Sequence, residues 1–167
     1  MARVFLSLGS TTGNRRAALQ AAVQALQALE AIEVVAQSEV YETEPWPEEE
    51  VPREQWVLAC AVEIQTGLPP YRLLELAQAI EGQVTGDAGP AGAGVPRRLD
   101  IDILLYEDQV LADYRLQIPH PLLHERRFVL QPLAEIAPEV EHPVLYLPIR
   151  DLLALLDDER GLHPYRA

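Results

Sequence analysis

Hydrophobic positions in the first half of the chain change between strand and helix patterns. Apolar residues dominate positions 3–8, which predicts a short strand. Leucine and valine then recur at helical spacing in an alanine-rich stretch, which predicts a helix from Asn14, a good capping residue, to about residue 29. The β-branched segment 32–43 and the apolar run 56–65 predict two further strands.

The second half repeats this alternation with more interruptions. Apolar residues at helical spacing predict a helix over residues 71–84. Strict alternation predicts a strand over residues 99–106, with residues 109–112 pairing beside it as a short extension. Prolines punctuate the remainder, where short helices are predicted at residues 128–137 and 149–156.

This order of elements indicates the fold class. Strand, helix, strand, strand, helix, strand is the order of a ferredoxin-like α+β sandwich, in which helices pack on one face of an antiparallel sheet. The length fits a single domain over residues 1–167. Residues 86–96 are rich in glycine and predict a flexible loop that could close over a ligand. Because this fold supports many activities, it does not by itself identify one.

Charge narrows the classes of partner. The chain has 13 basic and 26 acidic residues, a formal net charge of −13, and every basic residue is arginine. We therefore expect no nucleic-acid partner, and the absence of lysine excludes a Walker-type phosphate loop. A polyanionic substrate must be held by arginine, main-chain N–H groups or metal ions. No apolar run is long enough for a membrane span, so we expect a cytoplasmic protein without a membrane partner, with Cys60 as a buried thiol.

Two aspartates on one predicted strand are the first candidate site. Alternation places Asp100 and Asp102 on the same face of strand 99–106. Neighbouring carboxylates repel each other unless a cation lies between them or one is protonated. Mg²⁺ takes one or two carboxylates and completes its shell with water and phosphate oxygens. An ordinary solvated strand face remains the alternative, but Arg97 and Arg98 directly precede the pair and could fork onto a phosphate.

A second polar segment follows at residues 119–130. It contains His120, His124, Arg126, Arg127 and Phe128. Composition alone favours structural roles for the histidines and core packing for the phenylalanine, so this segment supports a site only in combination with the aspartate pair.

Together these segments resemble the 6-hydroxymethyl-7,8-dihydropterin pyrophosphokinase family. The strongest match is PRRLDIDI at residues 96–103. The second is IPHP at residues 118–121, followed by RRFVL at residues 126–130. Weaker matches extend the resemblance over residues 3–155, nearly the whole chain.

The resemblance implies an α+β fold and an enzyme of folate biosynthesis. Its reaction transfers pyrophosphate from MgATP to 6-hydroxymethyl-7,8-dihydropterin, giving the pterin diphosphate and AMP. Asp100 and Asp102 would bind two Mg²⁺ ions arriving with ATP, and Arg97 would be the third catalytic residue. The residues implied for ATP binding are Gln78, Glu81, Arg97, His120 and Arg126. Those implied for pterin binding are Thr43, Pro45, Trp46, Trp56 and Phe128. We expect a monomer.

Two departures from the family pattern keep other functions open. Residues 82–96 contain no arginine, whereas the family usually carries arginines in this loop. Leu58 stands where the family has an asparagine that hydrogen-bonds the pterin. A catalytically weakened pterin- or nucleotide-binding relative is therefore one alternative, and a metal-dependent phosphohydrolase on the same scaffold is another. A regulatory interaction domain would explain the fold but not the aspartate pair.

Overall fold

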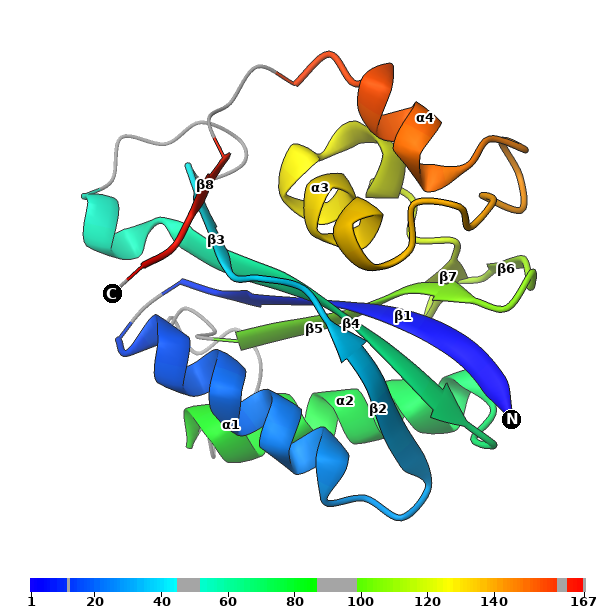
Figure 1. Cartoon of the computed structure of the whole chain (residues 1–167). Coiled ribbons are helices and arrows are strands. Elements are labelled where there is room, and N and C mark those ends of the chain that lie inside the picture. Colours follow the sequence, from blue (N-terminus) through cyan, green and yellow to red (C-terminus); the bar gives the residue numbers. More distant parts are fainter. Residues whose placement is uncertain (12, 45–51, 87–98, 159–161, 167) are drawn as a thin grey trace.

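An antiparallel sheet of six strands forms the centre of the structure (Figure 1). A computed structural model describes residues 1–167 apart from positions 12, 45–51, 87–98, 159–161 and 167. The strands of this sheet are β1 (Ala2–Ser10), β2 (Ile32–Gln37), β3 (Tyr41–Thr43), β4 (Val57–Thr66), β5 (Leu99–Tyr106) and β8 (Leu162–Pro164). The helices are α1 (Arg15–Gln27), α2 (Pro70–Thr85), α3 (Arg127–Ile136) and α4 (Ile149–Ala154). The described part also contains a hairpin of β6 (Leu111–Ala112) and β7 (Gln117–Ile118), and the 3₁₀ turns η1 (Arg53–Gln55) and η2 (Leu123–Glu125).

The strand order is β5-β1-β4-β3-β8, and β2 also pairs with β4. Every pairing is antiparallel, so the predicted sheet is confirmed. The central strand β1 pairs with β4 on one side and β5 on the other, over almost its whole length. The strands predicted from the apolar runs therefore form the middle of the sheet, where they are buried.

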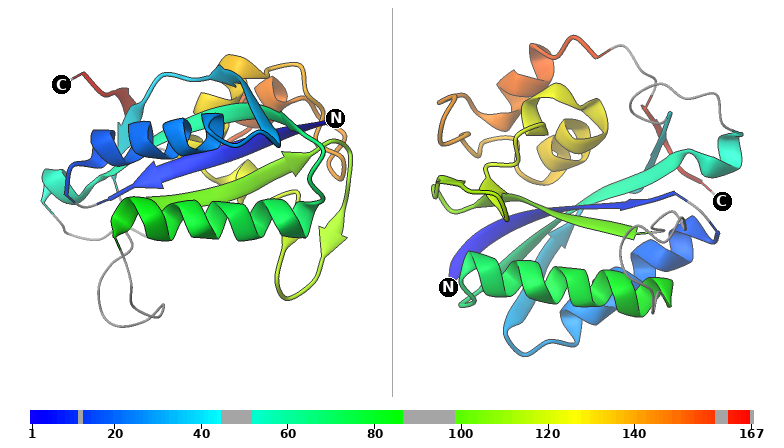
Figure 2. Two further views of the ribbon diagram at one scale, coloured as in Figure 1. Left: turned by 90° about the horizontal axis from the view of Figure 1, so that it is seen from below. Right: turned by 180° about the vertical axis from the view of Figure 1, so that it is seen from behind.

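Helices cover both faces of the sheet, rather than the single face expected from the order of elements. Helices α1 and α2 lie on one face, whereas α3 and α4 lie on the other (Figures 1 and 2). The reason lies in the strands: Leu6 and Leu8 of β1 pack in the core with α1 and α2. Phe5 points the opposite way, into a second core that includes Leu130 and Leu133 of α3. Strands with apolar residues on both faces need a layer of helices on each.

The predicted strand 32–43 is divided into β2 and β3. Its interruption centres on Ser38, whose main-chain N–H donates to the carbonyl of Ala61 at 2.9 Å. The Ser38 hydroxyl in turn accepts the N–H of Ala61, also at 2.9 Å. A side-chain oxygen thus replaces a ladder carbonyl, which shifts the chain out of regular pairing.

The segment 109–112 also differs from the prediction, because β6 pairs with β7 and not with β5. Asp113 accounts for the turn between them. Its carboxylate accepts the main-chain N–H groups of Arg115 and Leu116, at 2.8 and 3.0 Å. An aspartate that caps its own turn favours a local hairpin over pairing with a more distant strand.

A β-bulge in β5 sets the direction of its side chains. Leu6 of β1 pairs with Ile103, but Phe5 pairs with Leu105, so Leu104 is the extra residue. Before the bulge, residues 99, 101 and 103 face α1 and α2, while the aspartates face the opposite side. At the bulge, Leu104 and Leu105 both enter the core under α3. The strand therefore changes from a polar to an apolar face within one residue.

Two further features concern the helices and the single cysteine. Within the described ranges, no helix is long and apolar enough to cross a membrane. Cys60 is a buried free thiol, as predicted, and burial raises its pKa to about 12. The predicted flexible loop 86–96 lies outside the described residues except for Gly86, which ends α2 in the left-handed conformation.

The core under α3 generates a prediction about stability. Leu133→Ala should lower the free energy of unfolding by about 2–5 kcal/mol, because a fully buried leucine leaves a cavity. Leu155→Ala is the matched control, since Leu155 is 72% exposed and its loss should change stability by less than about 0.5 kcal/mol. Urea denaturation followed by circular dichroism measures both, and equal losses would contradict a packed core on this face.

Candidate functional site

The aspartate pair lies on the exposed polar face of β5. Asp100 and Asp102 are both exposed and alternate with buried apolar residues, so they share a face as the sequence predicts. On the neighbouring strand β1 they lie opposite Gly9 and Ser7. Because both aspartates are exposed, the pair is accessible to a ligand.

Helix α2 supports this strand along its free edge. Glu81 is buried, and its Oε2 accepts the main-chain N–H of Ile101 at 3.3 Å, between the two aspartates in sequence. This contact fixes the backbone from which both carboxylates project. Gln78 lies about one turn earlier and is exposed, and Leu74 lies one turn before that. The two α2 residues predicted to bind ATP therefore lie on one side of the helix, and Glu81 contacts β5 directly.

His120 is fixed beside β5 by main-chain contacts. The main-chain N–H of His120 donates to the carbonyl of Leu104, the bulge residue, at 3.0 Å. Its Nδ1 accepts the N–H of Leu122 at 3.2 Å, which assigns the proton of the neutral ring to Nε2. Burial lowers the pKa of His120, and the charge of Arg126 lowers it further. The ring is therefore a neutral Nε2–H donor at physiological pH.

Arg126 links the aspartate pair to the histidine. Although the Asp102 side chain reaches solvent, the protein atoms packed around it desolvate the carboxylate and raise its pKa, and the positive charge of Arg126 opposes that shift. The same charge acts on His120. The Arg126 guanidinium also lies over the ring of Phe128, at 5.7 Å from its centroid. The strand β5, the turn after β7 and the start of α3 thus place a carboxylate, an imidazole and a guanidinium in one electrostatic environment.

A cavity of about 290 Å³ opens beside this cluster. Asp102 and His120 line it, with Leu74 and Ile103 as an apolar wall. The hairpin from β6 to β7 forms its opposite side. Such a cavity, apolar on one side and ionic at its end, suits a flat base attached to a phosphate chain.

Sequence reasoning did not identify the hairpin as part of the site. Arg115 and Gln117 line the cavity from it. The hairpin is held to α2, because the Tyr71 hydroxyl donates to Asp113 and the Arg115 guanidinium lies 5.4 Å from the centroid of the Tyr71 ring. In the sequence, Asp113 is the one residue that indicates a turn here, and the sequence alone does not distinguish it from an ordinary loop residue.

The residues predicted to bind pterin are described in part. Thr43 is buried at the end of β3, where it pairs with Val57 of β4 and Leu162 of β8. Trp56 and Phe128 are half-buried. Pro45 and Trp46, also predicted for the pterin, lie outside the described residues, as does Arg97, which was predicted for ATP binding and catalysis.

Leu58, which departs from the family pattern, has a structural explanation. Its side chain is fully buried in the core between the sheet and helices α1 and α2. Leucine at this position therefore contributes to apolar packing, where an asparagine would need a hydrogen-bond partner.

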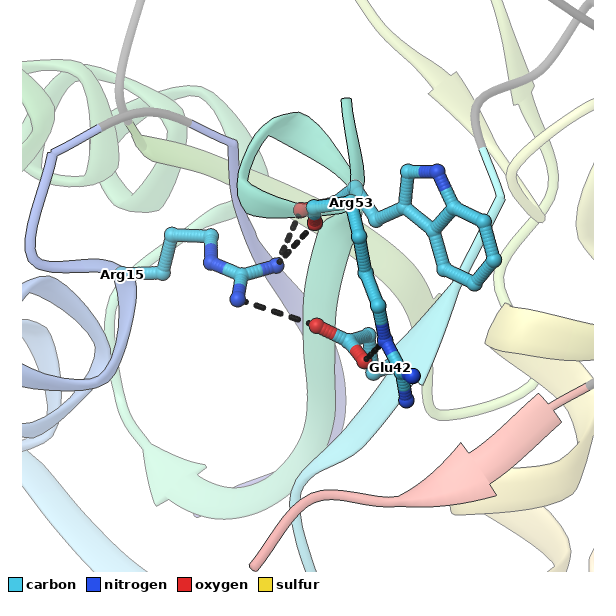
Figure 3. A network of polar contacts seen from close by, with 4 residues as sticks. Arg15, Glu42 and Arg53 are labelled. Carbon is cyan, nitrogen blue, oxygen red and sulfur yellow. Dashed lines mark hydrogen bonds and ion pairs between the residues drawn. The ribbon is translucent and has the colours of Figure 1, made fainter. Parts of the chain in front are cut away.

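A charged network next to Thr43 was not anticipated from the sequence (Figure 3). Glu42 of β3 is buried and forms ion pairs with Arg15 and Arg53, each at 2.9 Å. These three residues, together with Tyr165 and Arg166 near the C-terminus, help to line a second cavity of about 370 Å³. The only signal in the sequence is an acidic residue within the predicted strand 32–43, which usually indicates an exposed face.

Comparison with known proteins identifies strong sequence similarity. A family model described as 7,8-dihydro-6-hydroxymethylpterin-pyrophosphokinase (HPPK) matches residues 5–138. A protein of Methylorubrum extorquens named 2-amino-4-hydroxy-6-hydroxymethyldihydropteridine pyrophosphokinase is 43% identical over 157 residues, which is 94% of this chain and 95% of that protein. A Bacillus subtilis protein of the same name is 42% identical over 137 residues, 82% of this chain and 79% of that protein.

Solved structures show the same fold at lower identity. The wild-type HPPK-DHPS of Plasmodium falciparum aligns with a TM-score of 0.66 at 18% identity, covering 92% of this chain and 43% of that one. Another HPPK-DHPS structure, in complex with substrates, aligns with a TM-score of 0.69 at 14% identity and covers 92% of this chain and 44% of that one. This chain thus spans less than half the length of those solved chains.

The raised pKa of Asp102 predicts that its ionised carboxylate lowers the stability of the folded protein. Because the folded protein raises the pKa of this carboxyl, its ionised form destabilises the folded state at neutral pH. Asp102→Asn should therefore raise the melting temperature at pH 7. The advantage should disappear as the pH falls below the ordinary aspartate pKa of 3.8, since wild-type Asp102 is then protonated in both states. Calorimetry at several pH values measures this, and a lower melting temperature for the variant at pH 7 would contradict it.

Proposed function

This chain belongs to the 7,8-dihydro-6-hydroxymethylpterin-pyrophosphokinase family, and we propose that it transfers the pyrophosphoryl group of ATP to the hydroxymethyl oxygen of 6-hydroxymethyl-7,8-dihydropterin, releasing AMP. One observation carries the proposal: Asp102, His120 and Arg126 come together beside a cavity of about 290 Å³. The names of the relatives support the identity of the two substrates.

We propose that Asp100 and Asp102 hold two Mg²⁺ ions that arrive with ATP. The donor set fits, because both carboxylates are accessible, offer hard oxygen ligands and face the same way. Within the described part of the chain, no group of three or more acidic, histidine or cysteine side chains could enclose an ion. The remaining ligands would then be phosphate oxygens and water. When bound, Mg²⁺ neutralises the triphosphate and orients it for attack.

The residues around the pair supply the rest of the phosphate site in this proposal. Arg126 pairs with phosphate oxygens, and Arg97 adds a second guanidinium. His120 donates from Nε2–H, which its Nδ1 contact with Leu122 keeps available. Glu81 keeps β5 in place through Ile101, and Gln78 faces the nucleotide from α2. The base of ATP would occupy the cavity between α2 and the hairpin.

The pterin would lie between aromatic rings. Trp56 and Phe128 offer flat faces, and Thr43, Pro45 and Trp46 would border the ring with main-chain hydrogen bonds. Stacking needs little reorganisation for a planar heterocycle. Pyrophosphoryl transfer then depends on alignment and on neutralisation of charge, because its transition state is loose. As the hydroxymethyl oxygen bonds to the β-phosphorus of ATP, the bond from that phosphorus to the α-phosphate oxygen breaks and AMP leaves with this oxygen. The hydroxyl proton passes to solvent water, and because the transition state is loose we assign no side-chain general base.

Two competing functions predict different products. A metal-dependent phosphohydrolase would release ADP or phosphate without a pterin, and a weakened relative would bind ligands without turnover. The absence of arginine from residues 82–96 favours the weakened relative, whereas the assembled cluster of Asp102, His120 and Arg126 favours the transferase. A single domain and a monomer remain predictions, which light scattering and limited proteolysis would test. We also infer a cytoplasmic location, where ATP is available.

The transferase predicts the outcome of one assay. The protein with MgATP and 6-hydroxymethyl-7,8-dihydropterin should form AMP and the pterin diphosphate in equal amounts, measured by chromatography. Asp102→Ala should reduce turnover by about 10³-fold or more, because removal of electrostatic stabilisation at a transferred phosphoryl group has effects of this order. Asp108→Ala is the matched control, since Asp108 is an exposed aspartate just after the same strand and lies outside the site. Pterin-independent ADP, or normal turnover in Asp102→Ala, would refute the assignment.

A further inference from the structure

We propose that Glu42 is a positioning residue for the pterin site, acting through Arg15 and Arg53 on Trp56. The inference rests on the proposed function, in which Trp56 provides one of the two rings that enclose the pterin. It assigns a role to a network that lies apart from the aspartate pair and contacts neither ATP nor metal in that proposal.

Glu42 is the centre of the network (Figure 3). Its carboxylate is almost fully buried, with 6% of the side chain exposed. Oε2 pairs with an Nη atom of Arg15 and Oε1 pairs with Nε of Arg53, each at 2.9 Å. Both oxygens are therefore committed to cations from two other elements, the start of α1 and the turn η1. One side chain thus sets the positions of two guanidinium groups.

Arg15 transfers this constraint to the main chain of Trp56. Its Nη1 donates to the carbonyl of Trp56 at 2.7 Å and approaches the carbonyl of Arg53 at 3.4 Å (Figure 3). The N–H of Trp56 donates to the carbonyl of Arg53 at 3.0 Å. Both main-chain polar groups of Trp56 are therefore fixed. Because Arg15 is itself mostly buried, it holds one geometry and does not sample many.

Arg53 acts on the ring of the same tryptophan. Its guanidinium lies 5.5 Å from the centroid of the Trp56 ring, within the range of a cation–π contact. Glu42 holds this guanidinium at Nε and so restrains the angle at which it covers the indole. The network therefore fixes Trp56 at its backbone and at its ring.

The place of Glu42 next to the pterin site and the desolvation penalty of its ion pairs favour a role in binding over a role in stability alone. A buried ion pair is weak evidence for stability, since its desolvation penalty offsets much of its attraction. Glu42 also directly precedes Thr43, another residue of the proposed pterin site, in β3. A ring displaced by about 1 Å can cost up to about 100-fold in a reaction that depends on alignment. A rigid support next to the pterin site is thus worth more to the reaction than to folding.

The chain offers a matched control in Glu63. Glu63 lies toward the end of β4 that is farther along the chain from Trp56. It is buried and pairs with Arg3 at 3.1 Å. Glu42→Gln and Glu63→Gln each remove one buried carboxylate charge that faces arginine. Both should lower the melting temperature, but only Glu42→Gln should raise the KM for the pterin, by about tenfold or more, while the KM for ATP stays within twofold. Initial rates with each substrate varied in turn measure this difference.

A second variant covers the case in which Glu42→Gln does not fold. Arg53 is 68% exposed, so Arg53→Met keeps the apolar stem and the Glu42–Arg15 pair while removing the cation over Trp56. It should raise the pterin KM several-fold without changing the ATP KM. Equal pterin KM values in wild type, Arg53→Met and a folded Glu42→Gln would overturn the inference.

A measurement without substrate separates this inference from the proposed function. In a Trp46→Phe background, Trp56 is the only tryptophan, and acrylamide quenching of its fluorescence reports its mobility and exposure. Quenching should increase with Glu42→Gln and remain unchanged with Glu63→Gln. Unchanged quenching in both would refute the positioning role even in an active enzyme. A wild-type protein that forms no AMP, with quenching increased by Glu42→Gln alone, would instead refute the proposed reaction and leave the support of Trp56 established.

Discussion

The antiparallel pairing of β1 with β5 is the constraint on which the site depends. It places Asp100 and Asp102 opposite Gly9 and Ser7. It also contains the β-bulge at Leu104, where the side chains of β5 change face. That bulge residue presents the carbonyl that holds His120. A shift of one residue in this register would bury both carboxylates under α1 and α2 and would also displace the histidine. The ladder therefore specifies the site as well as the sheet.

The charge of the chain has a different meaning once it is placed in the structure. A net charge of −13 disfavours polyanions at long range, but phosphate recognition is local. Arg126 lies where its field reaches both Asp102 and His120, and Arg15 and Arg53 gather around Glu42. Arginine suits these places because its planar fork engages two acceptors at once. These three of the 13 arginines thus lie beside buried or partly desolvated carboxylates.

Much of the fold and part of the site follow from the sequence. The strand at residues 99–106 was predicted at its observed bounds, since alternation of apolar and acidic residues is a strong signal. The division of the strand at Ser38 was not predicted, because it depends on a side-chain contact with Ala61, more than twenty residues away. Helices on the second face were missed for a related reason: the apolar character of Phe5 shows that it is buried but not what covers it. The hairpin wall and the Glu42 network were missed because they arise from tertiary contacts between short polar segments. The roles of the individual site residues remain predictions.

The position of β8 carries a consequence for synthesis of the protein. Residues 162–164 complete the sheet by pairing with β3, a strand made more than a hundred residues earlier. Their neighbour Tyr165 donates its N–H to the carbonyl of Val40, and its ring lies 5.5 Å from the Arg15 guanidinium. On the ribosome, the outer edge of β3 therefore stays open until residues 162–164 have been translated. Closing so distant a contact is slow, and an open edge invites pairing with other chains. Until β8 docks, the edge of β3 is thus available for pairing with another chain.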